Sequence, residues 1–301
     1  MYYIYPKLSK RDYLLFRWGG AGLGNILFTY ARAVIYVQKH ENTKLIWPTW
    51  ISFKLGPILR HEPDKRFYND LFVNHSGYIN GFKKAKILLT KKHIKEQDIA
   101  KTKDLDDCVV DFEGFENCFQ EIMNDSQAVY KDIVRNVNPK YQDALAFDGK
   151  KSICMHVRLG DFARASWVEV ISGKHCSSIP IEWYVRMGNA LREIIGKNVK
   201  IYVFSDGTDE ELKSLLELEN VNRITFGSAI ADILALANAG ILVASGSSFS
   251  MWARYLGRMT TIMFPNQVKQ KILQPNDQGR EIVALDKLSL EDVEFIKKYW
   301  Y

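Results

Sequence analysis

The second half of the chain alternates short apolar segments with helical ones, and this pattern constrains the fold more than any other feature. The apolar segments predict strands at residues 152–157, 199–204, 223–226, 241–244 and 260–264. Between them the apolar spacing predicts helices over residues 181–195, from 208 onward, 230–239 and 248–256. Strands that alternate with helices in this way form βαβ units, so we expect an α/β fold with a parallel sheet.

The first half follows a less regular pattern. Residues 12–18 (DYLLFRW) predict a buried strand, a glycine-rich turn follows at 19–25, and residues 26–39 predict a helix. Further strands are expected at residues 44–47 and 108–112, whereas residues 47–81, rich in aromatic residues, receive no assignment.

The length of 301 residues suits two domains, at roughly 100–200 residues each. The polar stretch at residues 138–150 contains one proline and one glycine, which is typical of a linker. We therefore expect an N-terminal domain at residues 1–145 and a C-terminal domain at residues 146–301. The last helix, starting near Ser289, docks on its own core or packs back on the N-terminal domain.

Polar residues follow the predicted strands of the second half. His156 lies at the end of the first strand, Arg158 and Asp161 come after it, and Ser205 and Asp206 follow the next strand. Ligands of open parallel sheets bind at these carboxyl ends. We therefore expect these side chains to share one site.

A later strand leads into Ser247 and Ser248 at the start of a helix, where free N–H groups favour an anion. The planar guanidinium of Arg158 suits phosphate oxygens. Asp161 is the carboxylate nearest to Arg158 in the sequence and is the candidate general base. Its alternative role is to orient Arg158. These groups predict a site for a nucleotide diphosphate compound, although each alone is also typical of an ion pair or a helix cap.

Three other motifs fail their tests. The turn at 19–25 lacks the last glycine of a dinucleotide fingerprint, because Asn25 stands there. Asp104-Leu105-Asp106 resembles a metal-binding motif but precedes a strand, so we interpret it as structural. The serines at 247 and 248 do not form a nucleophile elbow, because Ser250 replaces the final glycine.

The chain resembles glycosyltransferase family 11, the α-1,2-fucosyltransferases. The resemblance spans most of the chain and rests on GLGN at 22–25, HVRLGD at 156–161, FSD at 204–206 and SSFSMW at 247–252. It implies a GT-B-like fold with two Rossmann-like domains whose parallel sheets face each other across a cleft. It also implies inverting transfer of fucose from GDP-fucose to a sugar hydroxyl in an α-1,2 linkage, with no metal and no cofactor.

The resemblance assigns roles to individual residues. Arg158 is expected on the donor pyrophosphate and His156 near the nucleotide. Asp232 would hold the guanine edge, and Ser248 would contact a phosphate. The family's N-terminal loop, which closes over the cleft, adds three donor-binding candidates to those at the strand ends: Gly22, Gly24 and Asn25.

Acceptor-binding residues are not identified by any motif. The aromatic residues Trp47, Trp50, Phe53 and Phe67 are candidates for stacking on an acceptor sugar. The resemblance implies a bacterial enzyme that decorates a surface glycan, with a lipid-linked acceptor. Two alternatives stay open: a related enzyme that uses another nucleotide-sugar such as GDP-mannose, and a non-catalytic GDP- or glycan-binding protein.

Charge and cysteine usage bear on partners and compartment. The net charge is +6, and eight lysines between Lys83 and Lys103 predict a solvated helical face rather than a nucleic-acid site. Four cysteines, Cys108, Cys118, Cys154 and Cys176, form no CxxC motif, so we expect no disulfide or zinc site and a cytoplasmic location. We expect no signal peptide and no membrane span. The basic aromatic end, residues 297–301, could rest on a membrane, although docking on the core is the favoured interpretation.

Overall fold

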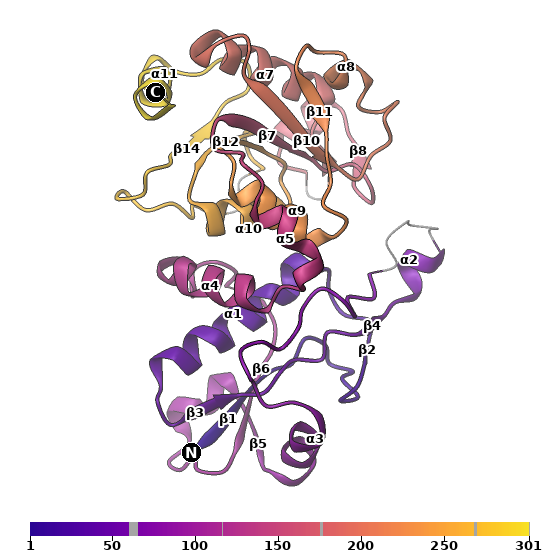
Figure 1. The fold of residues 1–301 in the computed structure, drawn as a ribbon, viewed down its shortest axis with the longest axis vertical. Helices are drawn as coiled ribbons and strands as arrows, with labels where there is room; N and C mark the ends of the chain where they lie inside the picture. The colour runs from indigo at the N-terminus through magenta and orange to yellow at the C-terminus, as the bar shows by residue number, and fades with distance from the viewer. Residues whose placement is uncertain (60–65, 116, 175–176, 268–269, 301) are drawn as a thin grey trace. The chain divides into compact units, whose positions relative to one another are not determined.

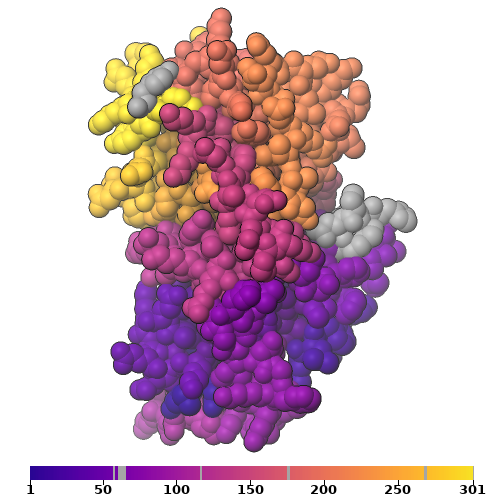
Figure 2. All heavy atoms as spheres, in the orientation of Figure 1, coloured from indigo at the N-terminus to yellow at the C-terminus, as the bar shows by residue number. Residues whose placement is uncertain are grey.

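The computed structural model describes residues 1–59, 66–115, 117–174, 177–267 and 270–300 (Figure 1, Figure 2). The chain divides into two compact units, Met1–Pro139 and Lys140–Tyr301, and each is described by itself. The division lies slightly before the expected boundary after residue 145, because α5 (Gln142–Leu145) packs against α9 (Ala229–Ala237) in the second unit.

The first unit contains a four-stranded parallel sheet in the order β3-β1-β6-β5. Its strands are β1 (Tyr2–Pro6), β3 (Thr43–Leu45), β5 (His93–Lys95) and β6 (Val109–Phe112). The prediction of a buried strand at 12–18 was wrong. Only β2 (Arg17–Trp18) is extended there, paired with β4 (Ser52–Phe53), while the neighbouring Leu15 is 80% exposed. The central strand is instead β1, where Ile4 and Tyr5 are buried.

The helices of the first unit are α1 (Leu23–Lys39), α2 (Leu55–Leu59), α3 (Gly81–Thr90) and α4 (Ser126–Asn136), with 3₁₀ turns η1 (Glu96–Lys101) and η2 (Met123–Asp125). α1 packs against the sheet through its buried apolar side chains, as its predicted helical pattern requires. The lysine run spans α3, β5 and η1 rather than one solvated face. Lys84 is buried, and its Nζ donates to Thr49 Oγ1 at 2.9 Å.

The second unit contains a six-stranded parallel sheet in the order β11-β10-β7-β12-β13-β14. Its strands are β7 (Ser152–Val157), β10 (Lys200–Ser205), β11 (Val221–Arg223), β12 (Ile241–Ala244), β13 (Thr260–Met263) and β14 (Glu281–Val283). Numbered along the unit, this is the 3-2-1-4-5-6 order of a Rossmann sheet. The parallel α/β prediction is therefore confirmed, and the three-residue β14 is the strand that the sequence pattern did not reveal.

Helices cover both faces of this sheet (Figure 1). Besides α5 and α9, they are α6 (Trp167–Ile171), α7 (Ile181–Ile195), α8 (Lys213–Leu216), α10 (Ser248–Gly257) and α11 (Leu290–Trp300), with the 3₁₀ turn η3 (Pro139–Tyr141). A separate short pair joins β8 (Ala163–Arg164) to β9 (Ser177–Ser178). Alternation along β7 places Ile153 and Met155 in the core with α7, so His156 points to the opposite face, toward α10.

The last helix, α11, packs against α7 of its own unit, where Ile296 is buried. Trp300 also contacts the core of the second unit, whereas Lys297, Lys298 and Tyr299 are exposed. Docking on its own core, the favoured interpretation, therefore holds.

Candidate nucleotide-sugar site

The crevice for a ligand in the second unit is set by its strand order. From β7 the chain runs outward through β10 and β11, then returns to the other side of β7 at β12. The reversal between β7 and β12 is the topological switch point, where ligands of such sheets bind at the carboxyl ends. The segments after Val157 and Ala244 both leave the sheet here. They carry four of the predicted site residues: Arg158, Asp161, Ser247 and Ser248.

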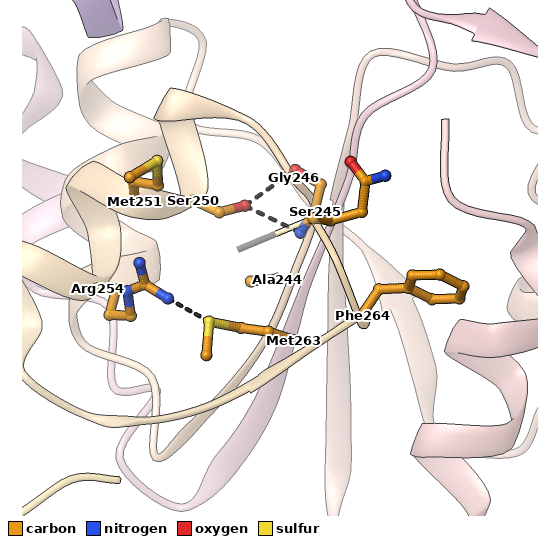
Figure 3. A pocket seen from close by; sticks show the side chains of 9 residues that line it. Ala244, Ser245, Gly246, Ser250, Met251, Arg254, Met263 and Phe264 are labelled. Carbon is orange, nitrogen blue, oxygen red and sulfur yellow. Dashed lines mark hydrogen bonds between the residues drawn. The ribbon is translucent and has the colours of Figure 1, made fainter. Parts of the chain in front are cut away.

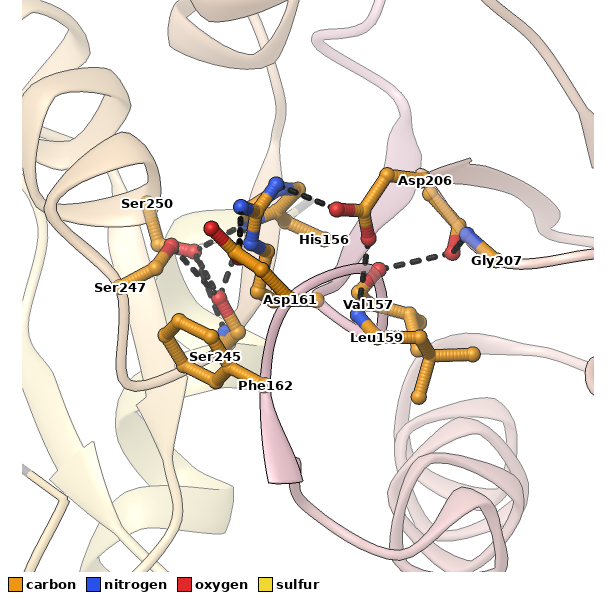
Figure 4. A network of polar contacts seen from close by, with 12 residues as sticks. His156, Val157, Leu159, Asp161, Phe162, Asp206, Gly207, Ser245, Ser247 and Ser250 are labelled. Carbon is orange, nitrogen blue, oxygen red and sulfur yellow. Dashed lines mark hydrogen bonds and ion pairs between the residues drawn. The ribbon is translucent and has the colours of Figure 1, made fainter. Parts of the chain in front are cut away.

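Arg158 lies between two carboxylates at this edge. Its guanidinium forms ion pairs with Asp161 and with Asp206, the residue that follows β10. The other carboxylate oxygen of Asp206 accepts the Leu159 N–H at 2.8 Å. The ring of Phe162 lies 5.4 Å from the guanidinium carbon. Asp206 thus joins the ends of β7 and β10 and holds Arg158 at the strand ends (Figure 4).

Ser205 reinforces the same junction. Its hydroxyl donates to the Val157 carbonyl at 2.7 Å and accepts the Gly207 N–H at 3.0 Å. A Cβ at Gly207 would lie 2.3 Å from Leu159 Cδ1, so only glycine fits there without a shift. The structure therefore gives Ser205 a positioning role, while its predicted contact with the donor stays a prediction.

His156 lies buried at the end of β7 in a neutral state. Its Nδ1 shares hydrogen bonds with the hydroxyls of Ser250 at 2.7 Å and Ser245 at 2.9 Å. The pKa of His156 is lowered to about 3, chiefly because the ring is buried; the Asp206 charge opposes this shift and the Arg158 charge adds to it. The ring stacks on Phe249, with centroids 4.6 Å apart. His156 therefore orients the serine loop and carries no charge at neutral pH.

The serine loop, residues 245–250, forms a compact hydroxyl cluster (Figure 4). The Ser245 hydroxyl lies 2.9 Å from that of Ser247 and 3.0 Å from that of Ser250, which also accepts the Ser245 N–H. Ser247 precedes α10, but its side chain does not cap the helix. The first N–H groups of α10, starting at Ser248, therefore remain suited to an anion.

A small pocket lies beneath this loop, between the ends of β12 and β13 (Figure 3). It is lined by Ser245, Gly246, Met263 and the buried Arg254. Arg254 forms an ion pair with Glu281, which anchors α10 to β14. The C-terminal half of α10 is thus held against the edge of the sheet.

Asp232 lies in the first turn of α9, apart from the Arg158 contacts. Its carboxylate accepts the Phe226 N–H at 2.6 Å and the Thr225 hydroxyl at 3.1 Å. Burial nevertheless raises the pKa of Asp232 to about 6. This carboxylate therefore gains or loses its proton close to neutral pH.

The remaining predicted site residues belong to the first unit. Gly22 is the N-cap of α1, Gly24 is buried in its first turn, and the Asn25 N–H donates to the Gly22 carbonyl at 3.0 Å. Their part in donor binding stays a prediction. The aromatic candidates need a correction: Trp47 and Trp50 are buried against Tyr30, so they cannot stack on a sugar, whereas Phe53 and Phe67 are exposed.

Sequence reasoning missed Ser245, Ser250 and Phe249 as members of the site. Their contacts with His156 join β7 to β12, two strands far apart in the sequence. The available signal was polar: Ser250 and Arg254, four residues apart, share one face of a helix whose other buried residues are apolar.

No metal centre is formed by the residues that the structure describes. Within them, no group of three or more His, Cys, Asp or Glu side chains could hold an ion. In the Asp104-Leu105-Asp106 motif, the first carboxylate accepts the Asp106 N–H at 2.8 Å. Cys108 and Cys154 are free thiols, the Cys118 thiol donates to the Phe115 carbonyl at 3.1 Å, and Cys176 lies outside the described residues.

The chain was compared with known proteins at the level of families, sequences and structures. The model of glycosyl transferase family 11 matches residues 78–279, well over half of the chain. The chain belongs to glycosyl transferase family 11. The matched segment contains the Arg158 cluster, the serine loop and Asp232, and the resemblance to this family is confirmed. None of the curated proteins matches the chain.

Solved structures share the fold of this family 11 member. It is similar to the α-1,6-fucosyltransferase NodZ of Bradyrhizobium co-crystallised with GDP, at 14% identity over 88% of this chain and 95% of that one, with a TM-score of 0.53. NodZ soaked with GDP-fucose gives 14% identity, 85% and 92% coverage and a TM-score of 0.51. POFUT1 in complex with GDP has 15% identity over 85% of this chain and 94% of that one, with a TM-score of 0.45. The NodZ likeness confirms the α/β fold of the GT-B kind.

Proposed function

We propose that this family 11 member transfers fucose from GDP-fucose to a sugar hydroxyl, with inversion and in an α-1,2 linkage. The observation that carries the proposal is the position of Arg158, which Asp206 holds at the switch point beside the N-terminus of α10. NodZ was co-crystallised with GDP and soaked with GDP-fucose, which supports a GDP-linked donor.

The chemistry follows from where charge develops. The bond between the fucose anomeric carbon and the β-phosphate oxygen breaks, and both electrons leave with GDP. The acceptor hydroxyl oxygen attacks the opposite face of the sugar and loses its proton to a base. Arg158 and the N–H groups of α10 would stabilise the anionic leaving group, which is the task that a metal performs in other transferases. We therefore propose that no metal is required.

Asp232 and Asp161 have different roles in this proposal. Asp232 would accept the N–H donors of the guanine edge, because its carboxylate is the buried acceptor on α9. The ion pair of Asp161 with Arg158 supports an orienting role, the alternative to its assignment as general base. The family implies a surface-glycan acceptor that is lipid-linked and a cytoplasmic location; we keep both as parts of the proposal.

The decisive experiment combines turnover with product linkage. We expect release of GDP from GDP-fucose with a galactoside acceptor, activity that persists in EDTA, and a product that an α-1,2-specific fucosidase cleaves. Arg158→Ala should lower kcat by about 10²–10³. Wild-type turnover of Arg158→Ala at saturating donor would refute the pyrophosphate role.

Donor panels separate the alternatives. If GDP-mannose is bound more tightly and hydrolysed faster than GDP-fucose, the proposed donor becomes GDP-mannose and the proposed binding site is unchanged. GDP binding without sugar transfer to any acceptor would indicate a non-catalytic binding protein.

A further inference from the structure

Exposed apolar side chains of the first unit concentrate around β2 and β4. Ten of the nineteen large apolar side chains that are exposed in the described part of the chain fall within residues 13–18 and 51–67. Leu15 is 80% exposed and Leu59 is 74% exposed. We call the following six residues the apolar patch: Leu15, Phe16, Trp18, Phe53, Leu55 and Leu59.

The β2–β4 pair makes this patch continuous. Its parallel register places Trp18 beside Phe53, and both are exposed, while their neighbours Arg17 and Ser52 are fully buried. The Phe16 ring meets Phe53 edge to face, with centroids 5.5 Å apart. Helix α2, which carries Leu55 and Leu59, follows β4 directly (Figure 1). Isolated exposed leucines are ordinary, whereas a joined group of this kind marks an interaction surface.

A hollow of about 310 Å³ opens within the patch. Trp18 and Leu55 line it together with the cationic side chains of Lys54 and Arg66. Lys54 Nζ donates to the Ala21 carbonyl at 2.6 Å. Beneath the glycine loop, the Arg17 guanidinium is fully buried, and its Nε and second terminal nitrogen have no partner among the described residues. A Cβ at Gly20, which lines the hollow, would lie 2.8 Å from Arg17, so this cation lies directly under the floor.

The charge around the patch identifies its partner. In the described residues of 10–18, 51–59 and 66–67, four basic side chains reach the surface, namely Lys10, Arg11, Lys54 and Arg66, and one acidic side chain, Asp12, lies among them. This excess of three equals half of the net charge of +6 of the whole chain. Aromatic and aliphatic side chains surrounded by cations are typical of proteins that rest on anionic bilayers. A protein-binding surface is instead depleted of lysine at its centre, and here Lys54 lines the hollow.

We propose that the apolar patch docks the first unit on an anionic lipid bilayer, with the lipid phosphate bound in the hollow between Lys54 and Arg66. The apolar side chains would enter the headgroup region and the cations would face the anionic lipid. In this proposal the membrane contact lies in the first unit, not at the basic aromatic C-terminal end that the sequence offered as an alternative. It does not rest on fucosyl transfer, because vesicle binding is measured without donor or acceptor. Within the described residues, no helix has the length and apolar character to span a bilayer.

Co-sedimentation with vesicles tests the proposal. We expect binding to phosphatidylcholine vesicles that contain about one third phosphatidylglycerol, weaker binding at high salt, and little binding to pure phosphatidylcholine. Leu15→Glu should weaken binding about tenfold or more, because one exposed leucine no longer transfers to the bilayer. Lys54→Gln should weaken binding to the anionic vesicles, and GDP affinity should remain unchanged in Leu15→Glu.

Matched variants keep the test falsifiable. Phe82→Glu alters a side chain that is 96% exposed on α3, outside the patch, and should leave vesicle binding intact. Reversal of charge at both positions, Lys297→Glu together with Lys298→Glu, tests the C-terminal surface. Equal binding by Leu15→Glu and the wild type, equal binding to both vesicle types, or loss only on reversal of the C-terminal lysines would overturn the proposal. A different result would also overturn it: the chain does not bind vesicles, forms a dimer instead, and Leu15→Glu dissociates that dimer.

Discussion

Gly160 leaves the space that the Asp206 carboxylate occupies. A Cβ at position 160 would lie 2.3 Å from Asp206 Oδ2, the oxygen that pairs with Arg158. Asp206 can therefore reach both Arg158 and the Leu159 N–H only because residue 160 has no side chain. The glycine of the HVRLGD segment thus allows Asp206 to hold Arg158, two residues before that glycine, in place.

Gly160→Ala should displace Asp206 and release Arg158 from its position. We expect kcat/KM for donor consumption to fall on the order of a hundredfold, because the leaving-group contact is no longer held in place. Asp206→Asn should produce a similar loss. Asp209→Asn is the matched control, since this exposed carboxylate on the same loop pairs with Arg223 instead. Steady-state kinetics check the expectation, and a Gly160→Ala enzyme with wild-type kcat/KM would contradict it.

The core of the second unit was predictable because its signals are local. β7 and β12 have the predicted bounds, since each is a short apolar run bordered by polar residues. The first half was harder to predict. The run DYLLFRW has the composition of a buried strand, yet a sequence pattern cannot show that most of its apolar side chains are exposed. The true first strand, β1, depends on pairing with β3 and β6 far along the chain.

The candidate site shows the same division. Arg158, Asp206 and the serines were predictable because strand ends meet at one edge of a parallel sheet. Their partners were not, because each contact crosses the fold: Gly160 with Asp206, and His156 with Ser250. Such pairs are fixed by packing between strands rather than by spacing along one segment.

Asp161→Asn distinguishes an orienting carboxylate from a general base. If Asp161 orients Arg158 through their ion pair, kcat should stay within about fivefold of the wild type, because Asp206 continues to hold Arg158 at the strand ends. The pH profile of kcat should keep its acidic limb. Loss of that limb together with a fall of 10²–10⁴ in kcat would instead identify Asp161 as the base.

Ser250→Ala and Ser248→Ala should separate stability from ligand binding. The Ser250 hydroxyl satisfies His156 Nδ1 and the Ser245 N–H in a buried setting. Its removal should lower the free energy of unfolding by about 1–3 kcal/mol. Ser248→Ala removes a more accessible hydroxyl at the start of α10 and should weaken GDP binding with little change in unfolding. Urea denaturation and calorimetry measure the two effects, and equal destabilisation by both changes would contradict this division.

Asp232 should make GDP binding depend on pH. Burial raises the pKa of this carboxyl to about 6, and the guanine N–H donors favour its ionised form. GDP should therefore bind less tightly as pH falls below about 6, approaching a tenfold loss per pH unit, and binding there should release a proton. Calorimetry from about pH 5 to about pH 8 in buffers of different ionisation enthalpy measures both quantities.

The same carboxyl gives an opposite trend for the free protein. Because its pKa is higher in the folded state than in the unfolded state, the free energy of unfolding should fall as pH rises from about 4 to about 6, then level off. Asp232→Asn should remove this contribution and the pH dependence of GDP binding together. Inosine diphosphate, which lacks the 2-amino donor, is the matched ligand and should bind the wild type less tightly. If Asp232→Asn bound GDP with the same affinity and pH dependence as the wild type, Asp232 would not contact guanine.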